Sequence, residues 1–110
     1  MAIQKDAGEI LIFLYQEYTN NNQWIDSDKI IKLTNWESGR INRTIDYLKD
    51  LNLIKINLFL GNINGVYNFG INGLTPAGIN IIENTKEFEK NFGFELNLGL
   101  IKFSWGTTKK

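Results

Sequence analysis

The chain has 110 residues, of which 43% are hydrophobic and 22% charged, a balance typical of one soluble globular domain with a single core. It contains no cysteine and no histidine, which excludes a disulfide framework, a thiolate metal site and a histidine general base. Twelve basic and twelve acidic residues cancel, so the formal net charge is zero. This counts against a strongly basic nucleic-acid-binding surface but leaves room for a local basic patch.

Two helices and a short strand are predicted in the first third of the chain. Apolar residues at three- and four-residue spacing indicate a first helix over about Asp6–Tyr18. The pair Trp24-Ile25 can form a stub of strand. Asp26 or Ser27 then suits the N-cap of a second, short helix, whose apolar residues lie within Ile30–Leu33.

A third helix is predicted from about Trp36 to Leu51 or Asn52, because its apolar residues form one stripe at steps of four, three and three. These positions are Ile41, Ile45, Leu48 and Leu51. The opposite face carries Arg40, Arg43, Tyr47 and Asp50. Gly39 lies inside the helix near its start, where glycine costs about 1 kcal/mol relative to alanine. A close approach of another group to the backbone is one explanation for this glycine.

The pattern changes to a period of two after the third helix, which predicts a β-hairpin. Its strands are expected at Leu53–Leu60 and Val66–Ile71, joined by a turn-rich tip over Gly61–Gly65. A further helix is predicted over Pro76–Asn91, with Thr75 as its N-cap and proline at its first position.

The C-terminal segment shows a second alternating pattern, from Phe92 to Trp105, with a slip in phase at Leu100-Ile101 that a bulge would explain. We expect an amphipathic strand there, followed by a disordered end over Gly106–Lys110. The chain thus divides into a domain at residues 1–91 and an extension at residues 92–110. The extension either covers the core or forms a dimer seam, and the seam is favoured because a lone amphipathic strand needs a partner edge.

Two segments, residues 41–54 and Leu74–Ile79, carry a resemblance to a known class of regulator. In the first, an apolar residue is followed two positions later by arginine, and then by leucines that lead into a strand. The second has the pattern Leu-Thr-x-x-Gly. They are similar to the recognition helix, and to the helix after the wing, of MarR-like and PadR-like winged helix-turn-helix proteins. The resemblance covers about residues 6–85 and implies an α+β fold with three helices, a β-hairpin wing and a further helix.

The resemblance implies that the third helix enters the major groove of double-stranded DNA by its N-terminal half. There, arginine can pair with guanine and asparagine with adenine, while Lys32 on the preceding helix can hold a phosphate. The hairpin tip is expected to touch the backbone or the minor groove. The predicted DNA-binding residues are Lys32, Trp36, Ser38, Gly39, Arg40, Asn42, Arg43, Asn62 and Asn64. We therefore expect a DNA-binding transcriptional regulator that acts as a homodimer.

Two features depart from the pattern of that family. The hairpin tip has no lysine or arginine, and the third helix carries Glu37, Asp46 and Asp50. Each missing cation removes about one released counterion from the salt dependence of binding. A monomer is therefore expected to bind DNA weakly or with strong salt sensitivity, and pairing of two copies on a two-fold site should improve binding.

Structural alternatives stay open for several of these residues. Arg40 and Arg43 can form surface pairs with side chains of their own helix, which are worth little. Trp36 can close the edge of the core instead of stacking on a base or sugar, and Trp24 and Trp105 are expected in the core or in an interface. The neutral charge also favours a second function, a winged-helix protein–protein interaction module that does not bind DNA.

Catalysis is not predicted. The carboxylate pairs Asp26/Asp28 and Glu87/Glu89 are explained by helix starts or solvated faces, and the sequence has no phosphate-binding loop or nucleophile elbow. No metal and no cofactor are expected. The sequence also has no signal-peptide pattern and no apolar run of membrane-spanning length, so we expect a cytoplasmic protein without a membrane partner.

Overall fold

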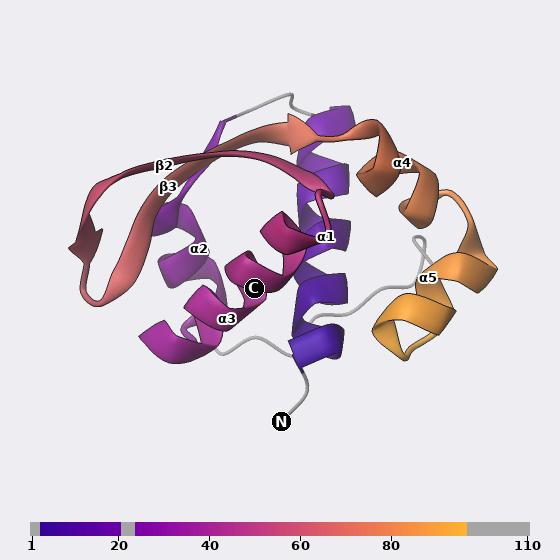
Figure 1. The fold of residues 1–110 in the computed structure, drawn as a ribbon, viewed down its shortest axis with the longest axis horizontal. Helices are drawn as coiled ribbons and strands as arrows, with labels where there is room; N and C mark the ends of the chain where they lie inside the picture. The colour runs from indigo at the N-terminus through magenta and orange to yellow at the C-terminus, as the bar shows by residue number, and fades with distance from the viewer. Residues whose placement is uncertain (1–2, 21–23, 97–110) are drawn as a thin grey trace.

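The computed structural model describes residues 3–20 and 24–96. Within these residues the chain forms five helices and one three-stranded antiparallel sheet, which is an α+β architecture (Figure 1). The elements in chain order are α1 (Ile3–Asn20), β1 (Ile25–Asp26), α2 (Ser27–Thr34), α3 (Ser38–Asp50), β2 (Ile54–Ile63), β3 (Val66–Leu74), α4 (Pro76–Ile82) and α5 (Thr85–Phe92). This order is compatible with the expected winged helix-turn-helix arrangement.

Helix α1 forms the centre of the domain, with α3, α4, α5 and β3 packed around it (Figure 1). The predicted apolar stripe, which includes Ile10, Leu11 and Leu14, is buried. Ile12 and Phe13 fall outside that stripe and are buried as well, because more than one side of the helix is covered. A central helix of this kind is apolar over most of its circumference and not on one face alone.

Strand β3 is the middle strand of the sheet, whose order is β1-β3-β2. Ile25 of β1 lies opposite Ile71, and both are buried together with Phe69, so this face of the sheet covers the core. Trp24 lies on the opposite face, where its ring covers Gly70 so closely that no side chain fits at that position. Strand β2 pairs only with β3 among the described residues and is therefore an edge strand.

Strand β2 contains a bulge that the alternating pattern did not predict. Between Leu58 and Asn62, three residues of β2 face only Asn68 of β3. Gly61 adopts a φ of +85° within this bulge, a conformation that favours glycine. The side-chain amide of Asn68 donates a hydrogen bond to the carbonyl of Leu60 at 3.1 Å, so the bulge is fixed from both strands.

The hairpin is longer than predicted and its turn is tighter. Strand β2 continues to Ile63 and β3 begins at Val66, so the turn consists of Asn64 and Gly65 and not of the whole segment Gly61–Gly65. Both turn residues have positive φ, +53° and +85°, as a two-residue type I′ turn requires. An Asn-Gly pair is the sequence most typical of this turn.

The prediction of one helix over Pro76–Asn91 is wrong, because the segment forms two helices, α4 and α5. Thr75 caps α4 as expected. Asn84 then leaves the helical conformation, and its side chain accepts a hydrogen bond from the N–H of Glu87 to cap α5. Asparagine bonds readily to nearby backbone groups, so it ends one helix and starts the next.

The prediction of a strand from Phe92 onward is also wrong where the structure describes it. Phe92 is the last residue of α5, and Gly93 ends the helix with a φ of +80°. A glycine in this left-handed conformation is a common helix terminator. Residues 94–96 form no strand and end in a buried leucine. The rest of the predicted strand, with Trp105, the dimer seam and the disordered end, lies at 97–110, outside the described residues.

Candidate nucleic-acid interface

Helices α2 and α3 are joined by a linker of three residues, 35–37, as expected for a helix-turn-helix. Asp26 caps α2 by accepting a hydrogen bond from the N–H of Lys29 at 3.0 Å. Asn35 ends α2 in the left-handed conformation, with a φ of +56°, and directs the chain into α3. Helix α3 begins at Ser38, so Trp36 lies in the linker and not in the helix as predicted.

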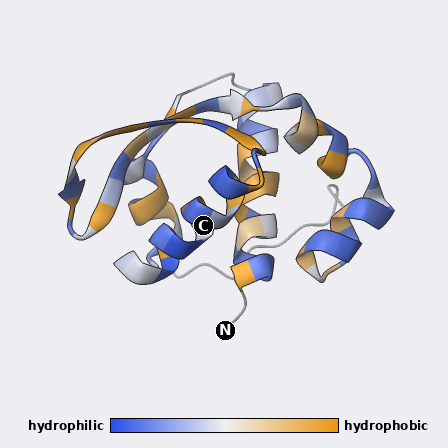
Figure 2. Cartoon of the chain, viewed as in Figure 1, coloured by the Kyte–Doolittle hydropathy of each residue, from blue (hydrophilic) through white to orange (hydrophobic). Residues whose placement is uncertain are grey.

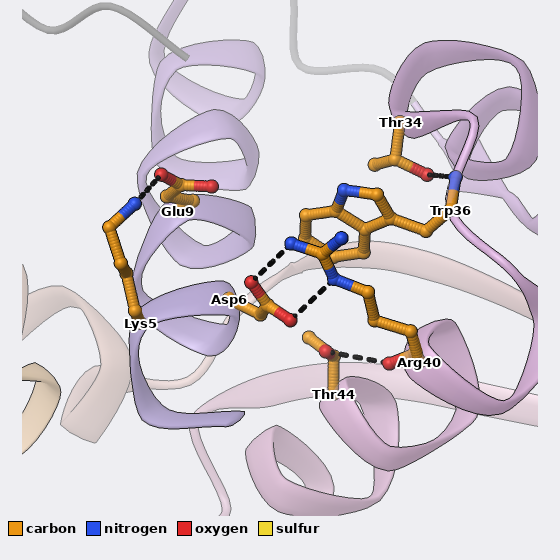
Figure 3. A network of polar contacts seen from close by, with 7 residues as sticks. All are labelled: Lys5, Asp6, Glu9, Thr34, Trp36, Arg40 and Thr44. Carbon is orange, nitrogen blue, oxygen red and sulfur yellow. Dashed lines mark hydrogen bonds and ion pairs between the residues drawn. The ribbon is translucent and has the colours of Figure 1, made fainter. Parts of the chain in front are cut away.

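Arg40, predicted as a base contact, makes contacts inside the protein. Its guanidinium donates two hydrogen bonds to the carboxylate of Asp6 in α1, at 2.8 and 2.9 Å (Figure 3). The same group lies over the ring of Trp36, 4.1 Å from its centroid. Trp36 is only 8% exposed and belongs to the core, so it cannot stack on a base. A planar guanidinium serves both contacts at once, because its edge pairs with a carboxylate while its face stacks on an aromatic ring.

The carboxylate that holds Arg40 is deeply buried. The side chain of Asp6 is 5% exposed, whereas that of Arg40 is 40% exposed. The hydrogen bond that Arg40 donates to Asp6 raises the pKa of Arg40 and outweighs the lowering effect of partial burial, so the guanidinium stays charged. Because a buried carboxylate is costly unless it is paired, removal of Arg40 should destabilise the fold. Asp6 was not predicted as the partner of Arg40, because the sequence pattern indicated only partners on the same helix as Arg40.

Asn42 is engaged as well, and it fastens the hairpin tip to α3. Its amide donates to the carbonyl of Gly65 and accepts from the N–H of Tyr67, both at 3.0 Å. Tyr67 in turn donates its hydroxyl to Asp46 of α3 at 3.0 Å, and this bond raises the pKa of Tyr67. Asn42, predicted to pair with adenine, thus uses one N–H and one acceptor site of its amide within the fold.

Three predicted contact residues remain at the surface of α3. Ser38 and Gly39 are partly exposed at the start of the helix, and Ser38 lies beside Gly65 of the hairpin turn. Arg43 is exposed and makes no ion pair with the part of the chain that the structure describes. A Cβ on Gly39 would meet the flexible ends of Arg43, at 3.2 Å, and Glu37, at 3.9 Å, so no backbone contact requires this glycine.

Lys32 and the two hairpin asparagines also lie at the surface. Lys32 forms an ion pair with Asp28 one turn earlier, at 3.0 Å, and both side chains are largely exposed. Such a pair contributes less than about 1 kcal/mol, so Lys32 can exchange it for a phosphate. Asn62 is exposed at the end of the bulge, and Asn64 is exposed in the turn, where its positive φ gives it a conformational role.

The exposed face of α3 is electrically balanced. Its exposed charged side chains are two cations and two carboxylates, namely Arg43, Asp46, Lys49 and Asp50. The hairpin adds a single charge, that of Lys55. A surface of this kind releases few counterions from DNA, which limits the electrostatic part of any binding free energy.

A large apolar surface is exposed on the hairpin, where the sequence predicted only strand residues. Leu58 and Phe59 are each 50% exposed, and Leu60 is 96% exposed. Trp24 is half exposed, with its ring 6.3 Å from that of Phe59. Figure 2 shows the hydrophobic colouring along β2. The bulge is the physical reason, because it interrupts the alternation that would have turned one of three successive side chains inward. Three consecutive large apolar residues, Leu-Phe-Leu, are the feature of the sequence from which this exposed surface could have been predicted.

Two further findings concern the kinds of partner. No helix in residues 3–20 or 24–96 combines the length and the apolar character needed to cross a bilayer. The same residues contain no group of three or more acidic, histidine or cysteine side chains placed to bind a metal ion.

The fold and the site thus define an α+β domain whose helix pair and hairpin are compatible with a winged helix. No family model matches the chain, and comparison with curated proteins and with solved structures gives no match either. Fold alone does not determine function, so the function has to be argued from the surface residues themselves.

Proposed function

We propose that the protein is a winged helix-turn-helix domain that binds duplex DNA through the N-terminal half of α3. The observation that supports this most is the position of Arg43, an exposed guanidinium on a helix whose early turns are tied to the hairpin by Asn42. A helix fits the major groove, where an arginine near its N-terminus can pair with guanine. Ser38 and Gly39 precede Arg43 with small side chains that permit a close approach to the DNA backbone.

The internal bonds of Arg40 and Asn42 support this proposal in a different role from the predicted one. Arg40 holds α3 against α1, and Asn42 holds the hairpin tip against α3. Both are positioning residues, which present Arg43 from rigid elements and so reduce the ordering that binding would otherwise require. Lys32 at the end of α2 is the second cation within this surface, and it takes a phosphate when it releases Asp28.

The balanced charge of α3 sets the expected affinity. Arg43 and Lys32 neutralise about two phosphates per copy, so the logarithm of the binding constant should fall with the logarithm of salt with a slope of about −2. Non-specific affinity should lie at the weak end of the usual range, with a dissociation constant of about 10⁻⁴ M at physiological salt.

Fluorescence anisotropy with a labelled duplex of mixed sequence, at about 25 and 150 mM salt, tests this proposal. Arg43→Ala should weaken binding about 5- to 10-fold and reduce the salt slope by about one unit. Lys49→Ala is the matched control, since it removes the same charge from the C-terminal end of the same helix, and it should change binding less than about twofold. Lack of binding by the wild type at low salt, or equal losses in both variants, contradicts the proposal.

A protein-binding module without DNA binding is the second candidate, and the apolar hairpin favours it. Leu58, Phe59 and Leu60 offer apolar contacts but no group that pairs with a phosphate. The same titration separates the two functions, because a protein-binding module would not retain duplex DNA even at low salt.

A further inference from the structure

We propose that the hairpin carries a self-association surface, on which a second copy of this chain docks about a two-fold axis. This surface, called the bulge patch below, consists of Trp24, Leu58, Phe59 and Leu60. It contains none of the residues proposed to contact DNA. The inference therefore stands or falls separately from the proposed function.

The projection of Leu60 is built into the backbone. Its side chain is 96% exposed because it lies in the bulge, which the positive φ of Gly61 and the hydrogen bond from Asn68 hold in place. Phe59 stays beside Trp24 on the outer face of the sheet. The largest apolar patch on a soluble monomer typically covers about 300–600 Å² and is often functional.

A hollow lies directly beside this projecting leucine. It has a volume of about 300 Å³, and its lining combines the apolar Leu58 and Phe59 with Tyr67 and the polar Asp46, Asn62 and Asn68. The bulge patch thus places a knob next to a recess. A two-fold contact needs a self-complementary surface, because each copy presents the same residues. Leu60 of each copy can then fill the hollow of the other.

The charge of the patch selects a second copy over a charged partner. Strand β2 has one charged residue, Lys55, and the hollow has one, Asp46, which already accepts a hydrogen bond from Tyr67. A strongly acidic or basic partner would find little to pair with, whereas an identical apolar patch meets little repulsion. The bulge and Lys55 also oppose a continuous strand-to-strand ladder, so we infer packing of side chains and not extension of the sheet.

The area of the patch indicates a weak, reversible dimer. Counting a fully exposed aromatic side chain at about 200 Å², the patch contributes roughly 300–400 Å² per copy. Two copies then bury about 600–800 Å², below the roughly 1,200 Å² at which stable interfaces begin. Association should therefore become visible only at concentrations of about 10⁻⁵ to 10⁻⁴ M or above.

Sedimentation velocity of the full chain over about 5 to 500 µM tests this inference. The wild type should shift from monomer towards dimer across that range. Leu60→Asn should raise the dimer dissociation constant at least about tenfold, because both copies in a two-fold dimer carry the substitution at the interface. Leu51→Asn is the matched control, since Leu51 is an exposed leucine at the end of α3 outside the patch, and it should leave the constant unchanged.

Two outcomes overturn the inference. One is a wild type that stays monomeric at the highest concentration. The other is a dimer that Leu60→Asn does not weaken, which would place the contact elsewhere in the chain. Misfolding does not confuse the result, because a side chain as exposed as Leu60 contributes little to the core, and the thermal transition of the variant verifies this. Neither leucine is among the residues proposed to bind DNA, so the anisotropy experiment gives an independent answer.

Discussion

Helix α3 and strand β2 follow each other in sequence and both lie at the surface, but they differ in which side chains are exposed to solvent. On α3, two polar side chains that were predicted to contact DNA are used within the fold, with Arg40 bonded to Asp6 and Asn42 bonded to the hairpin tip. On β2, apolar groups are left in contact with solvent, most of all Leu60. Polar side chains near the core are satisfied internally because an unpaired one is costly, whereas a small domain cannot cover every apolar side chain of an edge strand. The side chains available at the surface of this protein are thus those that have no partner inside the fold.

The largest loss of stability should come from substitution of Arg40 on α3. Arg40→Ala leaves the carboxylate of Asp6 buried without its partner, which should cost about 3 kcal/mol of unfolding free energy. Asp6→Ala leaves a guanidinium that is 40% exposed and can turn to water, so it should cost only about 1–2 kcal/mol. Urea unfolding followed by circular dichroism measures both. Equal losses would mean that burial of Asp6 does not dominate the pair.

A substitution of Leu60 on the hairpin is the control for that experiment. Leu60→Asn should change the unfolding free energy by less than about 0.5 kcal/mol, although it replaces a large apolar residue in a strand. A loss of stability comparable to that of Arg40→Ala would show that Leu60 is packed within a single copy of the protein.

A smaller effect is expected where the two regions touch. Asn42→Ala removes both hydrogen bonds to the hairpin tip and should cost about 1–2 kcal/mol. Amide hydrogen exchange should quicken at Tyr67, whose N–H loses its acceptor. Asn62→Ala, an exposed asparagine of the same hairpin, serves as control and should leave that exchange unchanged. If exchange at Tyr67 stays slow in Asn42→Ala, the tip does not depend on α3 for its position.

The smallest effect concerns Tyr67 and its dependence on pH. The hydrogen bond to Asp46 raises the pKa of Tyr67 above its ordinary 10.0, so its contribution to stability is present below about pH 10 and disappears as the pH rises through the raised pKa. An ultraviolet titration of phenolate should show two late tyrosines, Tyr67 and Tyr15, since the bond to Glu83 raises the pKa of Tyr15 as well. Tyr67→Phe should remove one late step and leave the other, whereas two remaining late steps would argue against the bond.

Elements that depend on neighbouring residues were largely predictable. The buried residues Ile41, Ile45 and Leu48 of α3 and the Thr75-Pro76 start of α4 follow from residues within a few positions of one another. Leu51, the fourth residue of the predicted stripe, lies just after the helix and is 42% exposed. The break at Asn84 had a local signal too, an asparagine able to cap the next turn, but the apolar spacing on either side obscured it. Of the candidate site, the outward position of Arg43 followed from the helical period, since it lies off the buried stripe.

The sequence by itself determined most of the helices and the hairpin, because propensities, caps and hydrophobic periods act over a few residues, but it did not separate α4 from α5. Only the tertiary structure decided which surface side chains are available. Asp6 meets Arg40 across 34 positions of sequence, and the bulge that exposes Leu60 arises from the register between two strands. Neither feature can be predicted from a local sequence pattern, because each depends on how separately formed elements pack. Packing decides whether a polar or apolar side chain meets an internal partner or solvent.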